Sequence, residues 1–206
     1  MIRNPKDLPR FTPQERANHW IVAISFVLLA LSGLSFFHPA FVPLNQLFGG
    51  GTWARILHPY IGVFMALFFL FMYFRFRGLN KRTKEDKEWM SRLGDVMGGR
   101  EENLPEQGKF NAGQKMVFRW SVISMIFLVI SGLMIWQAWF SVSAEWRRVA
   151  VVVHALFAFI MIATIMIHIY AAIWVKGSIR AMTAGTVSRG WARQHHRAWY
   201  REMTGK

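Results

Sequence analysis

Cysteine is absent from the 206-residue chain. Its absence excludes disulfide bonds, an iron–sulfur cluster held by the chain itself, a CxxCH haem attachment and a thiolate zinc site. A bound metal would therefore need histidine, carboxylate or thioether ligands. Acidic residues are scarce, with 11 against 25 lysines and arginines, so the formal net charge is +14. Near the N-terminus no short apolar stretch precedes a small-residue cleavage site, so we expect a signal anchor rather than a cleaved signal peptide.

Hydrophobic residues make up 53 % of the chain and gather in long runs rather than in stripes. Four uncharged runs reach about the 18 residues that a membrane-spanning helix needs. They are Trp20–Phe37, Ile56–Phe74, Trp120–Ala144 and Val149–Val175. Open backbone hydrogen bonds are too costly in hydrocarbon, so the runs must be helical. We predict an all-α integral membrane four-helix bundle of up-down topology, a single domain over 1–206 with transmembrane helices at about 13–37, 53–76, 115–138 and 148–175.

The basic residues are distributed unevenly around these runs. Of all lysines and arginines, only Arg55, Arg147 and Arg148 lie near the two short connections, 37–55 and 138–148. The positive-inside rule therefore predicts that both termini, the long connection 79–114 and the tail 176–206 face the cytoplasm. No recognition motif or aromatic interleaving accompanies the charge, so we expect no nucleic-acid partner.

Two segments carry local structural signals. Thr12-Pro13-Gln14-Glu15 predicts a helix start, with Thr12 as N-cap and Glu15 completing a capping box. Between Glu85 and Met97 apolar residues recur at helical spacing, which indicates an amphipathic helix on the inner membrane surface. Both this segment and the Trp- and Arg-rich tail suit binding of anionic membrane lipids or docking of a partner.

A short internal repeat is visible, since Leu31-Ser32-Gly33-Leu34 resembles Ile130-Ser131-Gly132-Leu133. Small residues allow helices to approach closely, so the resemblance is either convergence on good packing or a true repeat. A true repeat would relate helix pair one–two to pair three–four about an axis along the membrane normal. His58 would then lie opposite His154.

The seven histidines separate by depth. We expect His38, His195 and His196 to be solvated surface residues. His19, His58, His154 and His168 lie within a spanning helix or two turns from one. An ionisable group at that depth costs on the order of 2 kcal/mol or more, which marks these four as candidates for function.

Their spacing groups the four into pairs. His154 and His168 are separated by about 21 Å along one helix and by about 40° around it. One helix face therefore offers a nitrogen ligand near each side of the membrane. His58 matches the depth of His154, the outer of the two, and His19 can reach the level of His168. Two facing histidines at each depth suit six-coordinate haem, which needs two axial imidazoles per iron.

Other roles for these histidines fit less well. A zinc site needs three or four converging ligands, and two at each depth do not supply them. A proton relay usually recruits carboxylates, and none lies within the four apolar runs. Interhelical hydrogen bonding by each histidine alone stays open.

Short motifs around the histidines resemble one known family, the cytochrome b (gamma) subunit of membrane-bound respiratory formate dehydrogenase. The motifs are Arg16-Ala17-Asn18-His19-Trp20, Leu57-His58-Pro59, Phe110-Asn111-Ala112-Gly113-Gln114-Lys115, Val153-His154-Ala155 and Ile167-His168-Ile169-Tyr170. The resemblance covers essentially the whole chain. The Arg-x-x-His-Trp opening is shared with hydrogenase cytochromes b, whereas the Asn-x-Gly-Gln-Lys stretch is more discriminating.

The resemblance implies two haems b in a multi-pass protein of the bacterial inner membrane. His58 and His154 would hold the outer haem iron, and His19 and His168 the inner one. A periplasmic molybdenum or tungsten subunit would oxidise formate, and an iron–sulfur subunit would pass the electrons to this chain. Asn111, Gly113 and His168 would contact a quinone, menaquinone or ubiquinone, near the cytoplasmic side, and the complex could form a higher-order oligomer. Asn111 could instead only cap the third helix.

Two other functions remain open from the sequence. The chain could be the cytochrome b subunit of a hydrogenase or of another periplasmic oxidoreductase, which would share the Arg-x-x-His-Trp motif. It could also be a non-redox membrane anchor or ion carrier in which the histidines only join helices.

Overall fold

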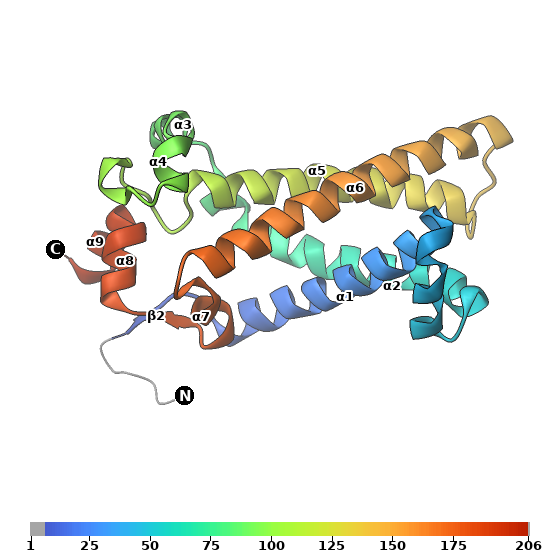
Figure 1. Ribbon diagram of the computed structural model, residues 1–206, viewed down its shortest axis with the longest axis horizontal. Helices are drawn as coiled ribbons and strands as arrows, with labels where there is room; N and C mark the ends of the chain where they lie inside the picture. The colour runs from blue at the N-terminus through green and yellow to red at the C-terminus, as the bar shows by residue number, and fades with distance from the viewer. Residues whose placement is uncertain (1–6, 206) are drawn as a thin grey trace. The chain divides into compact units, whose positions relative to one another are not determined.

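A computed structural model describes residues 7–205 and consists mainly of helices (Figure 1). Residues 1–6 and Lys206, the ends of the predicted single domain, lie outside the described residues. The α-helices are α1 (Pro13–Phe37), α2 (Gly51–Phe76), α3 (Lys84–Ser91), α4 (Leu93–Met97), α5 (Ala112–Trp136), α6 (Ala144–Trp174), α7 (Ser178–Thr183), α8 (Arg189–His195) and α9 (Arg197–Thr204). The 3-10 helices are η1 (Pro39–Phe48), η2 (Arg77–Asn80) and η3 (Glu101–Asn103), and the strands are β1 (Leu8–Pro9) and β2 (Thr186–Val187).

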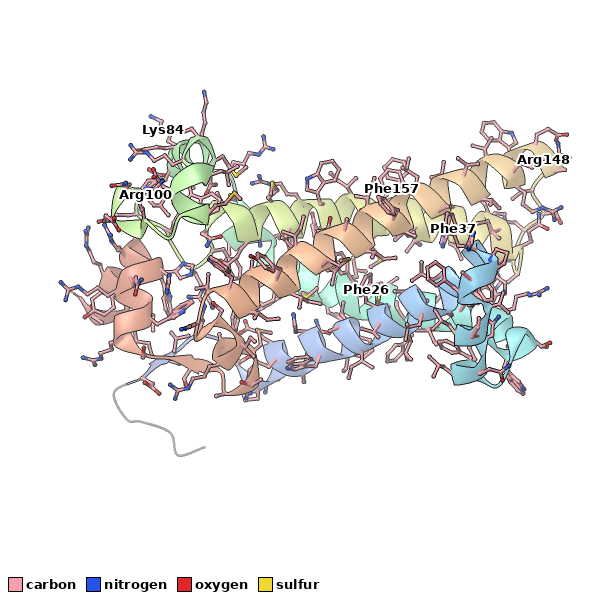
Figure 2. All side chains as sticks on the ribbon, in the orientation of Figure 1. Phe26, Phe37, Lys84, Arg100, Arg148 and Phe157 are labelled. Atoms are coloured by element: carbon pink, nitrogen blue, oxygen red, sulfur yellow. The ribbon has the colours of Figure 1, made fainter. Side chains whose placement is uncertain are left out.

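Within residues 7–205, four helices are long and apolar enough to cross a membrane, namely α1, α2 with η2, α5 and α6. Many of their large apolar side chains are exposed, among them Phe37 at the end of α1, which Figure 2 labels, whereas several serines are buried. This arrangement, with apolar side chains outside and small polar ones inside, is the reverse of that in a soluble protein and is expected where lipid surrounds a bundle. The predicted fold class, an all-α membrane four-helix bundle, is confirmed, apart from the two-residue antiparallel pairing of β1 with β2.

Three of the four spanning helices begin slightly before the expected bounds, whereas α1 begins at Pro13, as expected. The starts are Gly51 against 53, Ala112 against 115 and Ala144 against 148. At α5, Gln107 Oε1 and Asn111 Oδ1 accept from the backbone N–H groups of Ala112 and Gln114, and such polar residues lie outside an apolar run. The predicted capping box of α1 is confirmed, since Glu15 N donates to Thr12 Oγ1 at 3.2 Å and Thr12 N to Glu15 Oε2 at 2.9 Å.

The chain divides into two compact units. The first, called here the bundle unit, comprises residues 17–73 and 120–166. Its core contains Met65 and Phe69 from α2, Met125 from α5 and Met161 from α6. Phe127 and Phe157 stack with ring centroids 4.1 Å apart, and so fasten α5 to α6.

The second, called here the terminal unit, comprises the described residues among 1–16, 74–119 and 167–206. Its apolar core consists of five buried residues, Leu8, Ala181, Val187, Ala192 and Trp199. Charged groups are also buried here, since Lys115 Nζ donates to both carboxylate oxygens of Asp86 at 2.8 and 2.9 Å. The long connection is therefore fastened to the start of α5.

The expectation that His196 is a solvated surface residue is wrong, because its side chain is 1 % exposed. Its Nδ1 lies 2.7 Å from the Gly108 carbonyl and its Nε2 3.1 Å from Arg10 Nη2. Arginine has only donors and a carbonyl only accepts, so the ring is neutral with its proton on Nδ1. Burial, and then the Arg10 charge, lower the pKa of His196 to about 3. His38 is exposed, as expected, whereas His195 is half-buried.

The amphipathic segment differs from its prediction as well. Two short helices, α3 and α4, replace the single helix expected between Glu85 and Met97, with the break at Arg92. Trp89 is buried inside the terminal unit, and only Leu93 and Met97 of its apolar residues are well exposed. The break at Arg92 allows Trp89 on α3 to be buried while Met97 on α4 is exposed.

Candidate metal centre

His58 on α2 and His154 on α6 meet inside the bundle unit. Their ring centroids are 6.2 Å apart and their planes are inclined by 64°. His58 lies seven residues after the start of α2, and His154 ten residues after the start of α6. The sequence placed these two residues at matching depth from spacing alone, and the structure brings their rings together.

Each ring is held through its Nδ1 atom by a serine. Ser32 Oγ lies 2.7 Å from His58 Nδ1, and Ser131 Oγ lies 3.0 Å from His154 Nδ1. Both hydroxyls also lie within bonding distance of the carbonyl four residues earlier, at 2.8 Å for Leu28 and 2.5 Å for Phe127. Each hydroxyl has one proton to donate and two lone pairs that can accept, and it must make both contacts with these.

That single proton decides the tautomer of each ring. A backbone carbonyl only accepts, so a hydroxyl that donates to it leaves its oxygen to accept from Nδ1–H of the histidine. A neutral imidazole with its proton on Nδ1 has its lone pair on Nε2. With the hydroxyls bonded in this way, both rings can bind a metal through Nε2.

A glycine lies beside each serine and gives the ring room. A Cβ atom added at Gly33 would lie 3.5 Å from His58 Cε1, and one added at Gly132 would lie 3.2 Å from His154 Cε1. The Nδ1–Cε1 edge of each ring thus rests against a Ser-Gly pair. Both Ser-Gly pairs belong to the repeat at Leu31–Leu34 and Ile130–Leu133.

The His58–His154 pair fits a six-coordinate haem iron. A metal–imidazole bond is about 2 Å long and the ring centroid lies about 1 Å beyond the nitrogen, so two axial imidazoles have centroids about 6 Å apart. The observed separation of 6.2 Å matches this value. Among residues 7–205 no group of three or more histidine and acidic side chains is arranged to hold a metal ion.

The other two predicted haem ligands lie in different units. His19 is on α1 in the bundle unit, where its ring packs edge-on against Trp20 with centroids 5.5 Å apart. His168 is on α6 in the terminal unit, and both side chains are half-buried. Their pairing stays a prediction.

The predicted quinone residues Asn111 and Gly113 lie at the start of α5. Asn111 Oδ1 accepts from Gln114 N at 2.9 Å, and Gln114 Oε1 accepts from Asn111 N at 3.0 Å, so the cap considered from the sequence is present. The amide N–H donors of Asn111 are not used by this cap. A Cβ added at Gly113 would lie 3.1 Å from Trp89 Cη2, so Trp89 lines the same turn. His168 belongs to the same unit.

Several residues around these sites were not singled out from the sequence. The sequence shows Ser32 and Ser131 only as part of a repeat, because their bond to a ring nitrogen is a contact between helices. Trp89 and Asp86 were read as members of a surface helix, and both are buried against the start of α5.

Known proteins match nearly the whole chain. The family model described as prokaryotic cytochrome b561 matches residues 10–185. The nitrate-inducible formate dehydrogenase cytochrome b556 subunit of Escherichia coli is 45 % identical over 192 residues, covering 92 % of this chain and 88 % of the relative. A second formate dehydrogenase cytochrome b556 subunit of Escherichia coli is 42 % identical over 196 residues, covering 94 % and 92 %. The formate dehydrogenase cytochrome b556 subunit of Haemophilus influenzae is 35 % identical over 203 residues, covering 98 % and 85 %. The chain therefore belongs to the prokaryotic cytochrome b561 family, together with the cytochrome b556 subunits of formate dehydrogenase.

Proposed function

We propose that this chain is the dihaem cytochrome b subunit of a formate dehydrogenase complex and carries electrons across the inner membrane to a quinone. The meeting of the His58 and His154 rings, each with Nδ1 tied to a serine, carries the proposal. The similarity to cytochrome b556 subunits of formate dehydrogenase supports the choice of complex.

His58 and His154 would hold the outer haem, and His19 and His168 the inner one. Haem b bound in this way supplies a one-electron iron couple in an apolar environment. The protein's own part is to present neutral imidazoles at fixed positions and to keep water away from them. The exposed apolar side chains of the four spans suit a surrounding of lipid tails.

The basic residues orient the chain in the proposal. With the termini and the connection 79–114 in the cytoplasm, η1 and the α5–α6 connection face the periplasm. An iron–sulfur subunit would dock at that outer side, and a molybdenum or tungsten subunit beyond it would oxidise formate. The histidines near the outer ends of α2 and α6 would then receive the electrons.

The quinone would bind near the start of α5 on the cytoplasmic side. The N–H donors of Asn111 that the helix cap does not use can bond a quinone carbonyl without adding charge. Gly113 lets the Trp89 ring pack closely against this turn, and His168 would be the third contact. Quinone reduction there takes protons from the cytoplasm while formate oxidation releases them outside, so each turnover contributes to proton motive force.

The haem content of the purified chain tests the proposal. Pyridine extraction should count about two haems b per chain, and reduced-minus-oxidised spectra should show both to be redox-active. A haem count near zero would refute the proposal. A wild type without haem whose His168→Ala variant still folds would favour a non-redox anchor.

The identity of the complex is tested by the subunits that copurify. Molybdopterin with molybdenum or tungsten in the neighbouring subunit supports formate dehydrogenase. Nickel in its place would assign the chain to a hydrogenase, the alternative that the Arg-x-x-His-Trp motif left open.

A further inference from the structure

We infer that Ser32 and Ser131 are positioning residues of the outer haem, each fixing the tautomer and the ring orientation of one axial histidine. The inference rests on the proposed function, because it assigns these hydroxyls a role only if His58 and His154 bind iron. The role proposed for each hydroxyl is to hold the proton of the histidine on Nδ1 and so to set the basicity of Nε2.

The two contacts are built from the same atoms in the same arrangement. Both serines are nearly fully buried, and both hydroxyls bond a carbonyl of their own helix and a ring nitrogen of another helix. Each pairing joins neighbours in the bundle, α1 with α2 and α5 with α6. The arrangement therefore occurs twice, once in each copy of the repeat.

Close packing alone does not require these hydroxyls. Glycine or alanine would let the helices approach as closely, and the adjacent Gly33 and Gly132 already provide the space beside each ring. Ser124, seven residues before Ser131 on α5, is also fully buried, yet its hydroxyl has no hydrogen-bond partner among the described residues. Burial of a serine on this helix thus does not by itself bring a histidine to it.

A hydrogen bond from Nδ1–H has a known effect on a ligating imidazole. It locks the tautomer, restricts rotation of the ring and raises the basicity of the nitrogen that binds the metal. A more basic axial ligand favours ferric over ferrous iron, which lowers the reduction potential. Loss of the serine hydroxyl should therefore raise the potential of the outer haem and weaken its retention, by roughly tenfold or more.

The test compares Ser32→Ala and Ser131→Ala with the buried control Ser124→Ala, each in the purified full chain. The readouts are haem content, rate of haem release, and the midpoint potential of the outer haem in a spectroelectrochemical titration. We expect both alanine variants to shift the outer potential upward and to release that haem faster, while Ser124→Ala and the inner haem stay at wild-type values. Ser131→Thr, which restores a hydroxyl, should return the potential toward that of the wild type.

The outcomes separate the two proposals. A haem-free wild type, or full haem content after His58→Ala, would refute the proposed function itself. Two bound haems with an outer potential unchanged in Ser32→Ala and Ser131→Ala would leave the function standing and overturn the positioning role. If an alanine variant loses the haem altogether, failure of Ser131→Thr to restore it in a folded chain would equally overturn that role.

Discussion

Replacement of Gly132 by alanine should weaken the outer haem site, and the reason is steric. The added Cβ would lie 3.2 Å from His154 Cε1 and 3.6 Å from Nδ1. Carbon atoms pack best at about 3.5–4.0 Å, so the ring must move by a few tenths of an ångström. The same substitution at Gly33 places its Cβ 3.5 Å from His58 Cε1, which is ordinary contact.

The magnitude follows from the overpacking, which costs about 1–3 kcal/mol. For Gly132→Ala this cost corresponds to roughly 5- to 150-fold weaker retention of the outer haem. For Gly33→Ala the overpacking is nearly absent, and retention should be unchanged.

The assay is transfer of haem from the purified chain to an excess of an apo-haem acceptor, followed by absorbance. Gly62→Ala on α2 serves as a matched control, because its Cβ would meet only Leu29 Cδ2, at 3.9 Å. Release from Gly132→Ala should be faster than from Gly33→Ala, Gly62→Ala and the wild type. Equal release from all four chains, or faster release from Gly33→Ala alone, would refute the steric reasoning.

The remaining predictions concern the terminal unit. Gly113→Ala should lower the affinity for a quinone-site inhibitor, measured by haem-reoxidation titration, because its Cβ would lie 3.1 Å from Trp89 Cη2; unchanged affinity would contradict a quinone at this turn. Lys115→Met should destabilise the unit by about 3–5 kcal/mol in denaturant titration, because it leaves the Asp86 charge buried and unpaired, and Asp86→Leu added to it should recover most of the loss. Since the pKa of His196 is about 3 when folded and about 6.5 when unfolded, the unfolded chain binds the extra proton between these values. Stability should thus fall by about 2 kcal/mol from about pH 7.5 to about pH 5, as hydrogen exchange of α8 and α9 would report, and His196→Gln should flatten this dependence.

Hydropathy predicted the spanning helices because a bilayer imposes length and internal hydrogen bonding on every span. The matching depth of His58 and His154 was also predictable, because the depth of a residue along a straight helix follows from its number. The serine contacts were not, because they depend on the rotation of each helix about its own axis. A run that is apolar on all sides gives no signal for that rotation.

The terminal unit was less predictable for a different reason. His196 is buried because the tail folds against residues 107–109 and Arg10, segments far apart in the sequence. Trp89 turns inward because Asp86 on the same helix pairs with Lys115. The composition of the connection 79–114 and of the tail 176–206 indicated basic, exposed segments. No local sequence pattern shows which distant residue pairs with a charged side chain or covers an apolar one.

Low-temperature electron paramagnetic resonance of the oxidised chain, with integration of the ferric low-spin signals, tests most directly whether α2 and α6 share one iron. The wild type should show two signals of bis-imidazole type, and His58→Ala and His154→Ala should each remove the same one and leave the other intact. Loss of different signals in the two variants, or of neither, would contradict a common iron between these rings.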